Sequence, residues 1–415
     1  VLLDSGLSAR VTRDVSSLGG LGGLLVRKVV SVQIILGAIL GVISLIILKY
    51  YWKITWTFGS AAIVIGIIVH ITSMTFRGAL RSIGFARFEA GARIIERLGM
   101  TCSYAFLALL GVSEAEIYAC AAGLFFSLGG FFSMYKWEKN KISDGSYVLN
   151  YKLWDLIIPA LPFGLGFFLL TLNYRIPKLL LVSSAGFQEV GVFNVAMIGF
   201  FAALAMPNAI WQSAQPSFGR TQKEDVAERT EIFLRSRRMA RFGVSFGLPV
   251  FLIAGFYGFP LVFPESVTEE GIEPFRILSF LMLGWSSILL TSPDWGSVMG
   301  SKNPVGYSIS VVFFLIVQML GRWFFAEDYG VEEAAICFSL GAIASSAVYI
   351  FCTKFSDSNR IFAVGIMEYV AGICYTIVII WGVWDYLFIG IIVSLAIAIM
   401  WHILSERLSV MFFLQ

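Results

Sequence analysis

The chain has 415 residues, of which 58% are hydrophobic and only 14% are charged. A soluble globular protein carries roughly 25% charged residues, so most of the surface of this chain cannot face water. The formal net charge of +3 is too small to indicate a nucleic-acid partner. Composition therefore excludes a soluble enzyme and predicts an all-α, polytopic membrane protein.

Twelve apolar runs approach or reach the length of about 20 residues that a helix needs to cross a bilayer. In chain order the runs cover about 29–49, 55–76, 98–113, 115–135, 153–173, 188–212, 241–263, 275–298, 304–325, 332–353, 361–383 and 386–406. The third run is short for a span. No connecting loop exceeds roughly 25 residues, which leaves no room for a catalytic or nucleotide-binding domain outside the membrane.

The basic residues predict the orientation of these spans. If segment 1–28 is cytoplasmic and the sides alternate, 24 of the 30 lysines and arginines fall on the cytoplasmic side. Cytoplasmic loops of membrane proteins carry this excess of positive charge. The opposite loops are acidic, with Glu114, Glu116, Glu332 and Glu333 among their residues. We therefore expect a multi-pass protein whose C-terminus is also cytoplasmic.

No pattern in the chain indicates catalytic residues, a metal site or a bound cofactor. The five cysteines lie within apolar runs without a close-spaced pair, and His70 and His402 are far apart in sequence. These spacings match neither a zinc motif nor a disulfide framework. A glycine-rich phosphate-binding loop is also missing. Energy for any transport must then come from an ion gradient such as H⁺ or Na⁺, from the membrane potential or from substrate flow.

Two parts of the chain share a pattern that indicates an internal repeat. Ser8–Asp14 followed by Arg27-Lys28 resembles Ser217–Lys223 followed by Arg237-Arg238, each being a basic segment before a span. Parallel repeats are typical of two-lobed transporters. We therefore predict an N-lobe at 1–152, a six-helix C-lobe at 153–357 and an accessory helix pair at 358–415.

Several motifs give the chain a family resemblance. They are Leu3-Asp-Ser-Gly-Leu-Ser8 with Arg13-Asp14, Leu161-Pro162-Phe-Gly-Leu-Gly166, Asn173-Tyr-Arg-Ile-Pro177-Lys178, and Gly186 with Val190-Gly191. With them the chain resembles the polysaccharide-export (O-antigen or capsule repeat-unit) flippases of the multidrug/oligosaccharidyl-lipid/polysaccharide (MOP) superfamily. The sequence departs from that pattern at Ile176-Pro-Lys178, where many members carry an acid.

The resemblance implies a fold of fourteen helices, with two six-helix lobes and two accessory helices. On this basis the present chain would lack the first helix and most of the second. The resemblance further implies flipping of an undecaprenyl-pyrophosphate-linked oligosaccharide across a bacterial or archaeal cytoplasmic (inner) membrane, for polysaccharide, lipopolysaccharide or O-antigen biosynthesis. The implied partners are this lipid-linked oligosaccharide, membrane lipids, and polysaccharide polymerase and chain-length proteins.

Basic residues are the natural candidates for binding a pyrophosphate inside a membrane, because arginine donates bidentate hydrogen bonds and stays charged. We single out Arg13, Arg77, Arg81, Arg175 and Lys178. Arg175 and Lys178 are unusual because they lie on the side predicted to be poor in basic residues. The alternative for all five is anchoring at the membrane interface, where long basic side chains reach the headgroups.

Three further residues are candidates for ion coupling. His70 lies within an apolar run, and Asp155 and Asp294 lie near predicted cytoplasmic ends of helices. A histidine can relay protons, but it can equally be a hydrogen-bonded packing residue. The nearby pairs Glu89–Arg93 and Arg93–Glu96 have ordinary helical spacing, and we interpret them as structural.

Three other functions stay open at this point. An ion-coupled drug or metabolite antiporter of the same superfamily would need acids at membrane depth, of which the sequence shows few. A membrane glycan polymerase would need a large outer loop with catalytic Arg or His residues. A non-transporting scaffold in a polysaccharide assembly complex is also compatible with the sequence.

Overall fold

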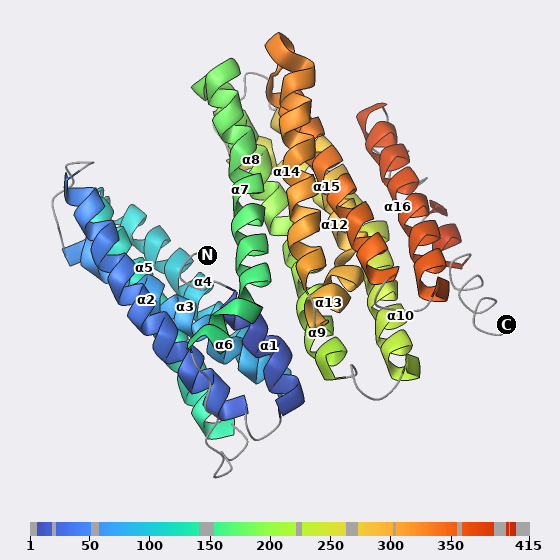
Figure 1. Cartoon of the computed structure of the whole chain (residues 1–415). Coiled ribbons are helices and arrows are strands. Elements are labelled where there is room, and N and C mark those ends of the chain that lie inside the picture. The colour runs from blue at the N-terminus through green and yellow to red at the C-terminus, as the bar shows by residue number, and fades with distance from the viewer. Residues whose placement is uncertain are drawn as a thin grey trace. The chain divides into compact units, whose positions relative to one another are not determined.

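The computed structural model describes residues 6–18, 22–50, 58–140, 153–220, 226–262, 273–301, 304–354, 359–385, 396–397 and 399–403. Every element within these residues is a helix (Figure 1), which confirms the predicted all-α class. The chain divides into two compact units, Val1–Leu165 and Gly166–Gln415. The three-part division predicted from the sequence stays a prediction.

The first unit is built from five long or medium helices and one short one. They are α1 (Leu7–Leu18), α2 (Gly22–Tyr50), α3 (Phe58–Ser82), α4 (Ala86–Leu109), α5 (Ala115–Asn140) and α6 (Leu153–Ile157). A 3₁₀ turn at Ile158–Ala160 leads into α7 (Leu161–Ser184), whose first residues belong to this unit. The segment around Ser8–Asp14, expected to be a basic loop, is part of α1.

The second unit contains the rest of α7 and nine further helices. They are α8 (Phe187–Ala203), α9 (Ala205–Arg220), α10 (Val226–Phe242), α11 (Leu248–Val262), α12 (Glu273–Leu290), α13 (Ser292–Gly300), α14 (Val305–Phe325), α15 (Val331–Lys354) and α16 (Asn359–Asp385). A π-helical turn at Gly243–Gly247 joins α10 to α11, and a 3₁₀ turn at Ala326–Asp328 follows α14.

The described residues contain nine helical segments long and apolar enough to span a membrane, or ten if the bent pair α12–α13 is one span. Eleven of the twelve predicted runs coincide with described helices, whereas most of 386–406 lies outside the described residues. The run at 98–113 proves to be the apolar end of the longer helix α4, whose first half carries charged residues.

Glycines allow α3 and α5 to pack closely. A Cβ atom added at Gly66 would lie 2.6 Å from the Cα of Gly123, and one added at Gly123 would lie 2.4 Å from the carbonyl oxygen of Ala62. Small residues let membrane helices approach in this way. The close approach brings side chains of α3, α4 and α5 together at one level of the first unit.

The bend between α12 and α13 has an identifiable cause. The two segments meet at an angle of 46°, and Pro293 stands in the first turn of α13. Proline has no N–H, so the carbonyl of Leu289 loses its usual helical donor. The Ser292 hydroxyl donates to that carbonyl at 2.7 Å instead. The break therefore leaves this carbonyl satisfied without water.

We expect Gly123→Ala to destabilise the protein, because its new methyl group would overlap the α3 backbone. Overpacking of this kind typically costs about 1–3 kcal/mol. The free energy of unfolding in mixed detergent micelles would measure the effect. Gly191→Ala in α8 is the matched control, because nothing lies within 4 Å of an added Cβ there. Equal stability of the two variants would contradict close helix packing at Gly123.

Candidate functional site

A buried ion pair joins α3 to α4 in the first unit. Arg77 and Glu96 are each only 1% exposed. Nη1 of Arg77 donates to Oε2 of Glu96 at 3.0 Å, and Nη2 donates to Oε1. Nε of Arg77 donates to the Ser133 hydroxyl of α5 at 3.1 Å. The guanidinium of α3 thus binds α4 through its two terminal nitrogens and α5 through Nε, and so connects three helices.

His70 adds a titratable group to the same carboxylate. Nδ1 of His70 lies 3.2 Å from Oε1 of Glu96, and its ring packs against Phe126 with centroids 4.7 Å apart. His70 and Arg77 are seven residues apart on α3, so they share one helix face. Glu96 therefore contacts both a permanent cation and a histidine, a cluster that we call the Glu96 cluster (His70, Arg77, Glu96 and Ser133).

Gly129 of α5 makes room for this carboxylate. A Cβ added at Gly129 would lie 2.4 Å from Cγ of Glu96. The Ser133 hydroxyl, one turn further along α5, donates to the Gly129 carbonyl at 2.8 Å as well as accepting from Arg77. Close packing of α5 is thus what holds the Glu96 cluster away from lipid.

A second ion-pair group lies nearer the start of α4. Arg81 donates to both carboxylate oxygens of Glu89, at 2.7 and 2.6 Å, and Arg93 donates to Glu89 at 2.7 Å. Burial alone would raise the pKa of Glu89, but the hydrogen bonds and charges of Arg81 and Arg93 outweigh it and the pKa is lowered. Arg77 and Arg81, two of the candidates for binding a pyrophosphate, contact separate carboxylates.

Arg10, a residue that the sequence analysis did not single out, connects the surroundings of Arg13 and Asp155. Arg10 of α1 is buried and donates through Nη1 to the backbone carbonyls of Asp155 and Leu156, both at 2.6 Å. Its Nε donates to Asp14, which also accepts from Arg13 at 2.6 Å. Arg10 therefore fastens α6 to α1, and Arg13 flanks it with its guanidinium 5.5 Å from the Phe163 ring centroid.

Asp294 lies in a buried charge network of the second unit. Arg237 of α10 donates to both oxygens of Asp294, at 3.0 and 2.8 Å. Arg241, one turn further along, donates to Glu368 of α16 at 2.9 Å. Arg237 also reaches the Gly365 carbonyl at 3.3 Å. These bonds tie α10, α13 and α16 together, and they place Asp294 beside a fixed cation.

Arg175 and Lys178 lie on α7 in the second unit. The Arg175 side chain is exposed and that of Lys178 is half-buried. Among the described residues neither has an ion-pair partner. The neighbouring Asn173 is fully buried and accepts from Gln318 of α14 at 2.9 Å while donating to the Val311 carbonyl at 3.1 Å. This amide pair aligns α7 with α14.

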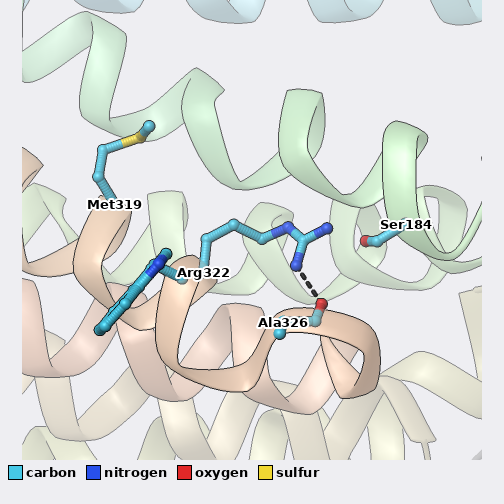
Figure 2. Close-up of a pocket in the computed structure, with 5 residues that line it drawn as sticks. Ser184, Met319, Arg322 and Ala326 are labelled. Atoms are coloured by element: carbon cyan, nitrogen blue, oxygen red, sulfur yellow. Dashed lines mark hydrogen bonds between the residues drawn. The ribbon is translucent and has the colours of Figure 1, made fainter.

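An open pocket of about 680 Å³ lies where α7 and α14 end (Figure 2). It is lined by Ser184, Met319, Arg322, Trp323 and Ala326. The Arg322 side chain extends along the pocket towards the α7 backbone, and its guanidinium donates to the Ala326 carbonyl. Within the described ranges no group of three or more His, Cys, Asp or Glu side chains could hold a metal ion.

Comparison with known proteins identifies the fold. No protein-family model and no curated protein matches the sequence. Among solved structures, the chain is similar to a MATE structure in complex with MaL6, with 17% identity over 89% of this chain and 84% of that one and a TM-score of 0.65. It is also similar to an outward-facing multidrug resistance MATE transporter of the MOP superfamily, with 16% identity, 89% and 85% coverage and a TM-score of 0.65.

A third similar structure is a MOP superfamily transporter from Pyrococcus furiosus, described as having a binding pocket of reverse polarity. Its identity is 17%, its coverage 89% and 85%, and its TM-score 0.63. This chain is therefore a polytopic, all-α membrane protein with the fold of MOP superfamily transporters. This fold agrees with the superfamily that the motifs predicted. The fold does not support the predicted flippase subfamily.

We expect Glu96→Leu to destabilise the protein by about 3–5 kcal/mol, since it leaves the buried charge of Arg77 without a partner. Arg77→Met combined with Glu96→Leu should cost clearly less, because it removes both charges. Unfolding in mixed micelles would give both values. Arg93→Gln serves as a control, because its side chain is 44% exposed. A double variant as unstable as the single one would contradict the pairing.

The ion pairs of Glu89 predict a pH dependence of stability. Its lowered folded pKa means that ionised Glu89 stabilises the fold above its ordinary value of 4.5, and that this contribution disappears as the pH falls through the lower folded value. Glu89→Gln should therefore reduce the melting temperature at neutral pH, with a difference from the unmodified protein that shrinks in acid. A difference that grows below 4.5 would contradict this account.

Proposed function

We propose that this chain is a secondary transporter that exchanges a cationic drug or metabolite for protons. Its fold is shared with MATE structures, one of which is described as a multidrug resistance transporter. This reading accounts for the described residues better than the flippase reading that the sequence motifs favoured. It also needs no nucleotide-binding domain, in keeping with the short loops of the chain.

The observation that carries the proposal is the Glu96 cluster. A cation antiporter needs an acid at membrane depth, and the apolar runs of the sequence contain few acids. Glu96 supplies one, because its buried carboxylate contacts His70, which lies midway along the candidate membrane span α3 (Phe58–Ser82), as well as Arg77. Ionisable residues inside membrane proteins usually mark substrate or ion pathways.

The cluster has the charges that proton exchange requires. Arg77 balances the charge of Glu96, so a proton on His70 gives the cluster one net positive charge. Histidine is the side chain whose charge changes most readily near physiological pH. A cationic substrate that approaches Glu96 would repel this proton, and the repulsion is strong where the effective dielectric constant is low. Proton uptake would in turn expel the cation.

Flipping of a lipid-linked oligosaccharide is the second candidate. Arg175 and Lys178 favour it, because these two cations lie on α7 without an acidic partner among the described residues. The reverse pocket polarity described for the Pyrococcus furiosus structure is a precedent for a substrate other than a cation on this fold. The lipid-linked glycan, its polymerase and chain-length partners, and the cytoplasmic membrane location belong to this candidate.

Transport by the purified protein in liposomes with an imposed pH gradient tests the first candidate. Adding a lipophilic cationic dye should dissipate the gradient, and His70→Gln should abolish that dye-induced proton flux. His402→Gln is the matched control, because it makes the same substitution at the other histidine of the chain, outside the Glu96 cluster. Full proton flux in His70→Gln would contradict the proposed coupling.

Leaflet-resolved labelling of a lipid-linked glycan in the same liposomes separates the two candidates. An antiporter should leave the glycan in its original leaflet. The flippase would be the better account if the unmodified protein flips the glycan and shows no dye-induced proton flux. In that case a variant combining Arg175→Ala with Lys178→Ala should lose the flipping.

A further inference from the structure

The pocket between the ends of α7 and α14 presents a positive charge in largely apolar surroundings. Ser184 is the last residue of α7, and Met319, Arg322 and Trp323 belong to the last two turns of α14. Figure 2 shows the Arg322 side chain lying between the two helices with Met319 further along the pocket. Among the described residues that line the pocket, Arg322 is the only one with a charged side chain.

Neutral groups are the only described partners of Arg322. Its Nη1 donates to the Ala326 carbonyl, and its guanidinium carbon lies 5.1 Å from the ring centroid of Tyr329. In the part of the chain that the structure describes, no carboxylate lies within ion-pair distance of it. The guanidinium therefore keeps donors and a full positive charge available to an anion.

Three acids of the neighbouring segments have other partners. Glu332 pairs with Arg276 at 3.1 Å. Glu333 accepts from the backbone N–H of Gly330 at 3.1 Å, and Glu189 accepts from that of Val331 at 2.8 Å. The exposed Asp328 lies in the turn after α14 but makes no ion pair with Arg322. Among the side chains that the structure describes in this acidic region, none therefore forms an ion pair with Arg322.

The backbone at Ala326 helps to fix the guanidinium. Among the described residues Ala326 is the only non-glycine residue with positive φ, at +43°. This conformation turns its carbonyl back towards Arg322. Strained backbone of this kind occurs preferentially at ligand-binding positions. Ala326 is also the residue at which α14 ends, so the end of this helix places the carbonyl that holds Arg322 in the pocket.

The surroundings of the pocket indicate an amphiphilic ligand. Trp323 and Phe324 are 79% and 77% exposed, and Met319 is 46% exposed. Exposed aromatic side chains at the end of a membrane helix lie at the level of the lipid headgroups. A soluble anion would use only Arg322, whereas a phospholipid would use the apolar wall as well. We propose that this pocket binds an anionic phospholipid, with its phosphate on Arg322 and its acyl chain against Met319 and Trp323.

Quenching of tryptophan fluorescence by brominated lipids tests this proposal on the full chain in neutral detergent. Brominated phosphatidylglycerol should quench more strongly than brominated phosphatidylcholine. Arg322→Gln should weaken phosphatidylglycerol binding about fivefold, the effect of one basic residue near an anionic headgroup, and weaken phosphatidylcholine binding less, because the choline cation already offsets the charge of its phosphate. Arg276→Gln is the matched control, because this exposed arginine already pairs with Glu332.

Two further measurements, one on a tryptophan variant and one with a soluble competitor, complete the test. Trp323→Phe should remove the quenching that depends on phosphatidylglycerol, and it gives a readout even if Arg322→Gln does not fold. Excess glycerol phosphate should fail to displace the lipid. Equal losses in Arg322→Gln and Arg276→Gln, unchanged quenching in Trp323→Phe, or displacement by glycerol phosphate would each overturn the proposal.

Discussion

Pairing of buried charge is the constraint on which the rest of the structure depends. Among the described residues four arginines are almost completely buried, namely Arg10, Arg77, Arg237 and Arg241. A charged side chain in an apolar environment is very costly unless a partner compensates it. Each of the four binds carboxylates, backbone carbonyls or both, on helices other than its own. The charges therefore determine which helices meet, and close packing at glycines such as Gly129 makes the meeting possible.

The same pairing separates structural charges from those available to ligands. Arg237 and Asp294 hold α10 against α13 through two hydrogen bonds, so this pair has a clear structural task. Glu96 differs because one of its partners, His70, is half-buried and titratable. Arg322 differs again, because its described partners are neutral. The best candidates for functional residues are therefore charged side chains whose ion pairing is incomplete or reversible.

Hydropathy was sufficient to predict most helices, since the length of an apolar run reflects the thickness of the bilayer. It failed at α4, where Glu89, Arg93 and Glu96 resemble a solvated loop. Glu89 and Glu96 are tolerated inside a helical bundle because Arg81 and Arg77 of α3 compensate them, whereas the partly exposed Arg93 pairs with Glu89 of its own helix. A local scale counts each charge as a cost and cannot include a partner 19 residues away, as for Arg77 and Glu96.

The candidate site was predictable only in part for the same reason. His70 and Arg77 stood out individually, but the sequence assigned them to different roles and interpreted Glu96 as a helical partner of Arg93. Only the approach of α3, α4 and α5 reveals that one carboxylate joins His70 to Arg77. The role of Arg10 was missed because its partners on α6 are backbone carbonyls that have no side-chain signature, and its spacing to Asp14 is that of an ordinary helical pair.

The central claim is that His70 and Glu96 form a reversible charge pair which senses a cationic substrate. The chain has two histidines, so His402→Gln leaves His70 as the only source of histidine signals in a ¹⁵N nuclear magnetic resonance spectrum. Adding a lipophilic cation should shift the His70 ring nitrogens towards the neutral imidazole, and Glu96→Gln should abolish that response. A His70 signal that is indifferent to the cation, or a response that persists in Glu96→Gln, would contradict the account.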